Sequence, residues 1–395
     1  MTSKSTAFIV SVCLMASGFA LAQQPQVSAA RNPVSVDVDA YLDRLQLPDG
    51  FEVSIYARGM DEARQIALSD NGVLYVGTRG EVGADAIGKV YAIPDNNGDG
   101  MVDEVITIAE GLNYPNGVAW HDGDLYVAEI SRILRYPDAD NNLRNMPAPE
   151  IVTDSLPTEY QHGWKFIDIG PDGKLYVPVG APCNICVPDG VFGTILRMDL
   201  DGSNQEIVAR GVRNTVGFTW HPQTGDLWFT DNGRDLWGDT TPPEELNRVT
   251  QAGQHFGYPY RYGKSIVDDE FPTSMSDSDF TSAVLEMPAH TAGLGVEFYT
   301  GNQFPAQYRG QLFAAYHGSW NRNPPAGYVL RLMRFTNGTA QSYEDFATGW
   351  LIDDPSGDDR LVYWGRPVDL EQTSDGSLLV SDDHNGVIYK ISYTD

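Results

Sequence analysis

The sequence predicts an all-β protein, folded as a single six-bladed β-propeller of four-stranded antiparallel blades over residues 34–393. The main observation is a repeat in which a polar glycine turn precedes a short apolar strand with a Leu-aromatic or Leu-Leu step. In addition, 40 glycines and 24 prolines indicate a chain dominated by turns, and no stretch reads as a second domain or a linker. A β-sandwich or two smaller β domains is the structural alternative.

The repeat occurs six times, with spacings of 51, 50, 52, 85 and 66 residues between the steps, which centre on Tyr75, Tyr126, Tyr176, Trp228, Phe313 and Leu379. Units of about 50 residues cannot bury both sheet faces alone, so they must stack on their neighbours as propeller blades do. An apolar strand also precedes the turn and predicts a hairpin. Examples are RQIALS (64–69), NGVAWH (116–121), WKFIDIG (164–170), VGFTWH (216–221) and RPVDLEQ (366–372).

The N-terminal segment predicts export. Lys4, an apolar stretch over residues 7–20 and small residues at Ala20 and Ala22 indicate a secretory signal peptide over residues 1–22, cleaved after Ala22. Residues 23–33 then form a short lead-in to the propeller. No later segment offers the roughly 20 apolar residues that a membrane helix needs. We therefore expect a periplasmic or secreted protein without a membrane span.

The charge balance limits the partners. There are 54 acidic and 26 basic residues, and the net charge is -28. Nucleic acid and anionic lipid are poor partners for such a surface. Acidic loops with Asn and Gly also suit a hard cation such as calcium, although solubility alone explains the charge equally well.

Two of the three cysteines, Cys183 and Cys186, form a C-x-x-C motif, and Cys13 leaves with the signal peptide. In an exported chain a local disulfide is the expected state of this pair. Haem attachment would need His at position 187, where Val187 stands, and a zinc site would need a second pair.

His162 is the histidine whose position suggests chemistry. His121 and His221 occupy a recurring slot before a turn, which argues for a structural role. His162 instead precedes the first strand of its repeat, so its side chain is expected to project from a loop toward the mouth of the tunnel. Arg213 and Asn214 hold the equivalent position in the next repeat and should line the same mouth. Lys165, out of phase with the inward face, is expected to be solvated.

Two loops could bind a cation. The turn DNGRD (231–235) could present backbone carbonyls to calcium, with a surface loop held by a salt bridge as the alternative. In PDNNGDGMVDE (94–104), Asp95, Asn97, Asp99 and Asp103 match positions one, three, five and nine of an EF-hand loop. Its twelfth position is Ile106 instead of Glu, so the loop is incomplete, and an Asx-rich turn is the alternative.

These motifs together resemble the glucose/sorbosone dehydrogenase family, which contains soluble aldose dehydrogenases dependent on pyrroloquinoline quinone (PQQ). The resemblance rests on His162 placed eight residues before GPDG, on VRN (212–214), on TDNGRDLWGDTTPPEELN (230–247) and on HFGYPY (255–260). APCNIC (181–186), AYHGSWNR (315–322) and WGRPVD (364–369) are most similar to its sorbosone dehydrogenase-like branch. The similarity covers nearly the whole mature chain.

The resemblance implies a role for each matching residue. His162 matches the catalytic base, and Arg213 and Asn214 match the pair at the reactive quinone carbonyl and the substrate. Gly233 and Arg234 match the turn whose carbonyls bind the calcium that also ligates PQQ. Two further matches are Glu245, at a second, structural calcium, and Arg366, at the cofactor carboxylates.

The chain also departs from the glucose dehydrogenase members of that family. Trp364 replaces an arginine, and a family lysine has no match, for which His317 or Arg322 is a substitute. PQQ carries three carboxylates and needs a cationic ring in so acidic a protein. Its candidates are Arg213, Arg366, Arg322 and Arg79.

The resemblance thus implies a PQQ- and calcium-dependent dehydrogenase that oxidises an aldose or a sugar aldehyde such as a sorbosone. Its base would take the hydroxyl proton while hydride leaves carbon. The substrate is expected to depend on residues 258–292, and the electron acceptor is not identified. The alternatives are a calcium-dependent lactonase and a non-catalytic binding propeller.

Overall fold

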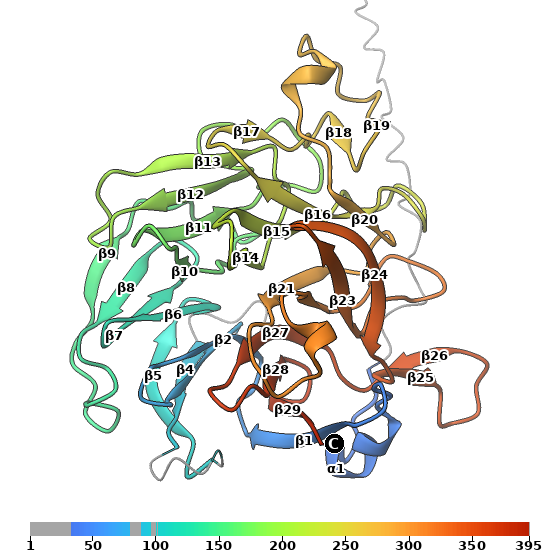
Figure 1. The fold of residues 1–395 in the computed structure, drawn as a ribbon. Helices are drawn as coiled ribbons and strands as arrows, with labels where there is room; N and C mark the ends of the chain where they lie inside the picture. Colours follow the sequence, from blue (N-terminus) through green and yellow to red (C-terminus); the bar gives the residue numbers. More distant parts are fainter. Residues whose placement is uncertain (1–32, 80–87, 96–99, 101, 395) are drawn as a thin grey trace, which may run out of the picture.

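The computed structural model describes residues 33–79, 88–95, 100 and 102–394. Six small antiparallel sheets stand around a central axis, which confirms the six-bladed β-propeller (Figure 1). The signal peptide predicted over residues 1–22, Cys13, and positions 97 and 99 of the incomplete calcium loop lie outside the described residues.

Each blade contains four strands, which follow chain order from the axis outward in blades 1 to 5, and the first three blades follow one another along the chain. Blade 1 comprises β2 (Ala63–Leu68), β3 (Leu74–Thr78), β4 (Gly88–Ile93) and β5 (Ile106–Leu112). Blade 2 comprises β6 (Gly117–His121), β7 (Asp124–Ala128), β8 (Ile133–Tyr136) and β9 (Glu150–Thr153). Blade 3 comprises β10 (Asp168–Ile169), β11 (Leu175–Val179), β12 (Thr194–Met198) and β13 (Glu206–Arg210), with β17 (Gln254–His255) added in parallel at its edge.

The last three blades carry the longer insertions. Blade 4 comprises β14 (Phe218–Trp220), β15 (Leu227–Asp231), β16 (Glu244–Val249) and β20 (Leu285–Met287). Blade 5 comprises β21 (Gly293–Phe298), β22 (Leu312–Tyr316), β23 (Val329–Thr336) and β24 (Thr339–Ala347). Blade 6 comprises β27 (Pro367–Gln372), β28 (Leu378–Asp382), β29 (Val387–Tyr393) and β1 (Phe51–Arg58).

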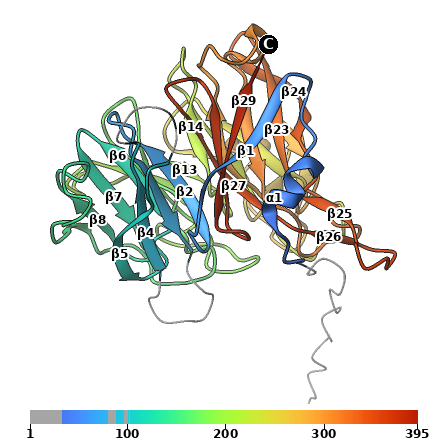
Figure 2. The same ribbon diagram turned by 90° about the horizontal axis from the view of Figure 1, so that it is seen from below.

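The N-terminal strand closes the ring. β1 pairs antiparallel with β29, from Phe51 opposite Tyr393 to Arg58 opposite Val387, so the two ends of the chain share one blade. Figure 2 shows β1 beside β29, with the short α1 (Val38–Tyr41) near it. Because β1 leads into blade 1, its pairing with β29 in blade 6 joins the first blade to the last by a hydrogen-bond ladder.

The remaining elements are short and lie outside the six blades. Two are hairpins, β18 (Arg261–Tyr262) with β19 (Ile266–Val267) and β25 (Leu351–Asp353) with β26 (Leu361–Tyr363). Three are 3-10 turns, η1 (Leu42–Arg44), η2 (Asp277–Asp279) and η3 (Ala306–Tyr308). No helix in the described part of the chain is long and apolar enough to cross a membrane.

The repeat in the sequence marks one strand per blade. All six Leu-aromatic or Leu-Leu steps lie in the second strand of their blades, where both residues are buried. The reason is packing between blades: Trp228 and Leu246 of blade 4 share one apolar cluster with Phe298 and Leu312 of blade 5. A strand that is covered on both faces reads as a continuous apolar run.

Two local expectations were wrong. The segment WKFIDIG was predicted as a strand, but only Asp168–Ile169 forms one. Residues 164–167 before it form a loop. Lys165 was expected to be solvated, yet it is 1% exposed. Its Nζ donates to the carbonyl of Gly163 at 2.5 Å, and burial lowers its pKa to about 7.

Candidate active site

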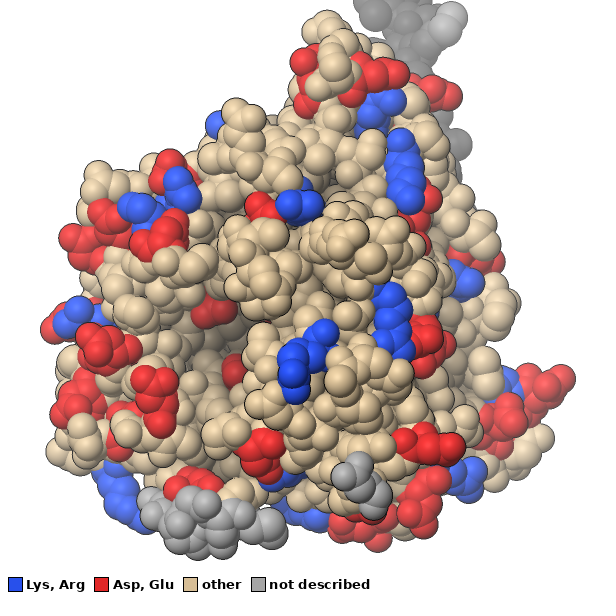
Figure 3. Space-filling model, in the orientation of Figure 1, with Lys and Arg blue, Asp and Glu red and all other residues tan. Residues whose placement is uncertain are grey.

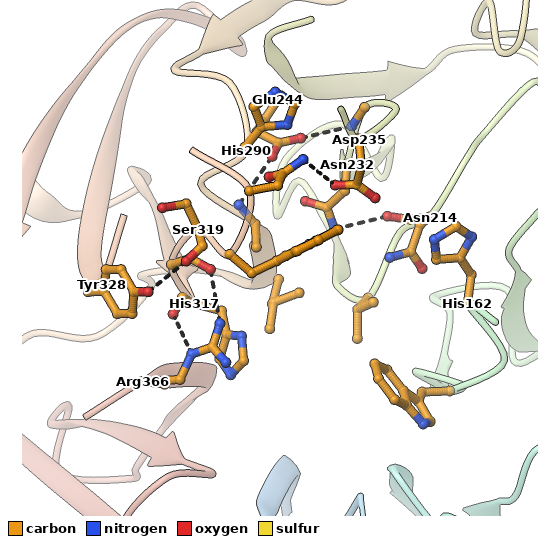
Figure 4. A pocket seen from close by; sticks show the side chains of 18 of the residues that line it. His162, Asn214, Asn232, Asp235, Glu244, His290, His317, Ser319, Tyr328 and Arg366 are labelled. Carbon is orange, nitrogen blue, oxygen red and sulfur yellow. Dashed lines mark hydrogen bonds between the residues drawn. The ribbon is translucent and has the colours of Figure 1, made fainter. Parts of the chain in front are cut away.

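A cavity of about 590 Å³ lies at one end of the propeller axis. Several of its polar residues come from equivalent places in different blades, at or just before the first strand, because these loops converge on the axis. They include Arg64 in blade 1, His162 before β10, Arg213 and Asn214 before β14, His290 before β21 and Arg366 before β27. In Figure 4, His162 and Asn214 lie side by side, across the cavity from His317 and Arg366.

His162 is held as a neutral imidazole. Its Nδ1 lies 2.7 Å from the carbonyl oxygen of Ala181, which can only accept, so Nδ1 carries the proton and Nε2 has a free lone pair. Burial and the nearby Arg213 charge lower its pKa to about 3. The residue has a φ of 51°, and a Cβ at Gly180 would lie 2.5 Å from the His162 Cβ. Only glycine at position 180 leaves room for this ring.

Arg213 is buried at the cavity wall, 2% exposed, and its guanidinium is held by three neighbours. Nε and Nη2 donate to the backbone and side-chain oxygens of Asn184, each at 2.9 Å. Nη2 also donates to Asp235 at 2.7 Å, and Nη1 donates to the carbonyl of Asn232 at 3.1 Å. The charge is therefore fixed in place with its counter-ion.

Asn214 is positioned through its backbone. Its N–H donates to Asp231 Oδ1 at 2.7 Å, and its carbonyl accepts from the backbone N–H and the side-chain amide of Asn232. The side chain is thus available to the cavity that it lines.

Arg366 and His317 form the opposite wall. Arg366 donates to the carbonyls of His317 at 3.1 Å and Gly318 at 2.9 Å, and it lies over the rings of Tyr328 and Tyr363. Burial and the Arg366 charge lower the pKa of His317 to about 3. Two uncharged acceptors and two ring faces hold Arg366, which leaves its charge uncompensated by these contacts.

Arg64 completes the cationic lining and was not expected from the sequence. It is 2% exposed, donates to Asp383 at 3.0 Å, and shares that carboxylate with Nε2 of His317. Arg64 and Arg79 both lie over the ring of Trp164, another lining residue. The sequence contains a signal for Arg64, since RQIALS and RPVDLEQ both place an arginine at the start of a blade.

The loop between β15 and β16 supplies oxygen atoms. Gly233 lines the cavity, and its N–H donates to Glu244 Oε2 at 2.9 Å. Glu244 also lines the cavity, and burial raises its pKa to about 8. Asn232 Oδ1 is buried beside them with no hydrogen-bond partner. An orphaned amide oxygen next to a carboxylate suits a hard cation.

Glu245 and the Arg234 side chain point elsewhere. Glu245 accepts from Gly263 at 2.5 Å and from Asn247 at 2.9 Å, because successive residues of β16 face opposite sides. The Arg234 guanidinium is paired with Asp268 at 2.6 Å, so only its backbone can contribute to a site at this turn.

Other predicted site residues lie away from the cavity. Arg322 is not among the lining residues and donates to the carbonyl of Ala289 at 2.9 Å. In the incomplete calcium loop, Asp95 accepts from the N–H of Gly100 at 2.8 Å, and Asp103 N–H donates to the carbonyl of Pro94. Within the described ranges, no group of three or more His, Cys, Asp or Glu side chains is arranged to hold a metal ion.

The predicted disulfide between Cys183 and Cys186 is present. Its turn lies beside the cavity, since Asn184 between the two cysteines contacts Arg213.

The cavity differs in charge from the whole protein. Four arginines, Arg64, Arg79, Arg213 and Arg366, line it against the two carboxyl groups of Asp235 and Glu244. The chain as a whole carries a net charge of -28. The arrangement can attract a multivalent anion and place it beside a neutral imidazole.

Solved structures with a similar fold include PQQ-binding sugar dehydrogenases. The PQQ domain of the pyranose dehydrogenase of Coprinopsis cinerea, in its holo form, superposes with a TM-score of 0.73 at 20% identity, over 88% of this chain and 97% of that one. The PQQ-bound aldose sugar dehydrogenase of Streptomyces coelicolor gives 0.61 at 18% identity, over 88% and 100%.

Relatives by sequence agree with this likeness. An uncharacterized protein of Borreliella burgdorferi is 32% identical over 91% of this chain and 94% of its own length. The PQQ-dependent pyranose dehydrogenase of Coprinopsis cinerea is 30% identical over 88% of this chain, which spans 54% of that protein. A family described as a domain of unknown function (DUF7133) matches residues 37–393. This chain belongs to that family, whose match covers the whole propeller.

Proposed function

We propose that this protein is an exported PQQ- and calcium-dependent dehydrogenase that oxidises an aldose or a sugar aldehyde such as a sorbosone. The observation that carries the proposal is the convergence of Arg64, Arg79, Arg213 and Arg366 on one cavity of an acidic protein. Carboxylates pair with three of these arginines, whereas Arg366 donates to main-chain carbonyls, so an anion in the cavity would compensate its charge. A flat tricarboxylate would do so, and the named relatives contain such a group.

The residues present fit PQQ. Its carboxylates would meet guanidinium groups, for which charge-assisted hydrogen bonds are strong. When bound, PQQ supplies the two-electron oxidant that takes hydride from the substrate carbon. Asn214, with its side chain directed to the cavity, would orient the substrate or the quinone.

His162 would act as the general base. Its Nε2 lone pair faces the cavity while Nδ1–H is bonded to Ala181, so the proton of a substrate hydroxyl can transfer to Nε2. Burial, and after it the Arg213 charge, lowers the pKa of this ring in the free protein. An anion bound at Arg213 would offset that charge and raise the pKa of His162 toward the working range.

Calcium would bind at the turn after β15. The carbonyls of Gly233 and Arg234 are the proposed ligands, and the orphaned Asn232 Oδ1 and the Glu244 carboxylate are the nearest further oxygens. Glu245, on the other side of β16, would serve a second, structural ion. We also propose export through a signal peptide over residues 1–22, which the disulfide supports because such bonds persist in oxidising compartments.

The first experiment is titration of PQQ into the purified protein with and without calcium, followed by aldose-dependent dye reduction. We expect calcium-dependent binding that Arg366→Met weakens at least about ten-fold, since one charge-assisted contact is worth roughly 1.5–3 kcal/mol. Arg334→Met, on β23, the third strand of blade 5, is the matched control. Failure of the wild-type protein to bind PQQ would overturn the proposal and favour a calcium-dependent lactonase. Binding without turnover of any aldose or aldehyde would favour a binding propeller.

A further inference from the structure

The disulfide turn over residues 183–186 lies against the buried Arg213 of the cavity. Asn184, between the two cysteines, uses every polar group of its side chain there. Its Oδ1 accepts from Arg213 Nη2 at 2.9 Å and from the backbone N–H of Asp235 at 2.8 Å. Its Nδ2 donates to the carbonyl of Asp235 at 3.1 Å. Its backbone oxygen accepts from Arg213 Nε at 2.9 Å.

These contacts determine which part of Arg213 can meet a ligand. A guanidinium has five N–H groups, and four of them have acceptors here: one on Nε, two on Nη2 and one on Nη1. The second N–H of Nη1 is the one left for the cavity that Arg213 lines. Asn184 supplies two of the four acceptors and therefore sets the plane and direction of the guanidinium.

The turn is itself held from outside. The disulfide closes it, and the hydroxyl of Tyr258 accepts from the N–H of Cys186 at 3.1 Å. Cys183 and Ile185 pack in a small apolar cluster with Tyr258, Tyr262 and three other side chains, namely Ala181, Trp237 and Ile266. Tyr258, Tyr262 and Ile266 of that cluster belong to residues 258–292, so this insertion packs against the turn.

We propose that Asn184 is a positioning residue for Arg213, and that the disulfide turn and the insertion act together to aim this guanidinium into the cavity. The claim that this guanidinium meets an anionic cofactor rests on the proposed function. The positioning of Arg213 by Asn184 does not, because all of its contacts belong to this chain. A purely structural turn would contribute stability without setting the Arg213 geometry.

Two variants separate the side-chain contacts of Asn184 from its backbone contact. Asn184→Leu removes the side-chain contacts with a residue of similar size. Cys183→Ser with Cys186→Ser loosens the turn that holds the backbone oxygen. The first readout needs no cofactor: the hydrogen exchange rates of the Arg213 Nη2–H and Nε–H groups, measured by NMR of arginine-labelled protein. We expect exchange at least about ten-fold faster at Nη2 in Asn184→Leu and at Nε in the double serine variant, since protection falls with the loss of a hydrogen bond. Asn141→Leu, at an exposed turn of blade 2, is the matched control.

The second readout is the dissociation constant for PQQ in the presence of calcium, expected to rise about ten-fold in both variants and to stay unchanged in Asn141→Leu. A lower melting temperature with unchanged exchange at Arg213 would overturn the positioning role. Faster exchange in a protein whose wild type does not bind PQQ would uphold that role and contradict the proposed function. If the double serine variant does not fold, Asn184→Leu decides alone.

Discussion

Arginines line the mouth of the propeller and carboxyl groups line the channel below it, although the same inner strands line both. Arg366 stands just before β27, whereas Asp369 and Glu371 follow on that strand, the latter about 15 Å further along an extended chain. Asp168 of β10 and Glu297 of β21 lie near them, since each carboxyl group affects the pKa of others in the set. Figure 3 shows acidic side chains inside the hollow at the centre of the ring.

The two regions differ because of how their charges are compensated. In the channel, burial raises the pKa of Asp168 and Asp369 to about 7 and that of Glu297 to about 8, and the neighbouring carboxyl groups add to this for Glu297. At the mouth, each arginine has fixed acceptors. Arg64 and Arg213 have carboxylates, and Arg366 has main-chain carbonyls.

The comparison explains how one tunnel can hold an anion at one end only. A multivalent anion is attracted to the arginines at the mouth, whereas the carboxyl groups beneath them offer it no positive charge. Charge at the mouth therefore serves ligand binding, whereas charge in the channel costs stability. Variants in the two regions should differ accordingly.

The largest effect is expected at the mouth, for His162→Gln. Loss of a positioned general base should lower kcat by about 10²–10⁴-fold in the PQQ-loaded enzyme. Steady-state kinetics with an excess of PQQ and calcium would measure it, and a melting curve would check the fold. His121→Gln, in the repeated slot at a turn far from the cavity, should leave kcat unchanged. Full activity of His162→Gln would remove this residue from the chemistry.

A smaller effect is expected for the buried ion pair at the mouth. Arg64 and Asp383 are 2% and 3% exposed at their side chains, 3.0 Å apart. Asp383→Asn leaves Arg64 without its counter-charge and should lower the free energy of unfolding by about 3–5 kcal/mol. Asp39→Asn, at the exposed pair with Arg58, should cost at most about 1 kcal/mol. Equal losses in urea denaturation would mean that burial does not distinguish the pairs.

The channel should show the opposite sign. Because the folded-state pKa of Glu297 is raised to about 8, the folded protein holds a proton that the unfolded chain releases above about pH 4.5. Stability from this group is present at low pH and is lost as pH rises toward 8. Glu297→Gln should therefore raise the free energy of unfolding at pH 8.5 by about 1–2 kcal/mol and flatten its fall from pH 5.

Exposed Glu110→Gln on β5 is the control for the channel variant. A Glu297→Gln protein that is less stable than wild type at pH 8.5 would show that the channel carboxyl groups are compensated, and the contrast with the mouth would then fail.

The smallest expected effect is an absence of titration. Since burial and Arg213 lower the pKa of His162 to about 3, its imidazole should stay neutral from pH 5 to 8 in the free protein, with the proton on Nδ1. Long-range nitrogen–proton NMR would report both properties, with His162→Gln used to assign the signal. A titration midpoint near 6.5 would show that the ring is solvated.

The sequence by itself determined the fold and which loops of the blades carry His162, Arg213 and Asn214. Glycine turns before Leu-aromatic steps identified the second strand of every blade, because inter-blade packing demands apolar residues on both faces of that strand. The same repeat placed His162, Arg213 and Asn214 at equivalent loop positions, and the structure brings them to one cavity. Local patterns suffice where one repeated unit carries the information.

Only the tertiary structure decided which side chains face the cavity. Glu244 and not Glu245 lines it, because the pleat of β16 assigns adjacent residues to opposite sides. Arg322 turns away, and Asn184 reaches Arg213 from a loop in another blade. Such contacts join residues far apart in the chain, so their geometry depends on how whole blades pack, which no local pattern encodes.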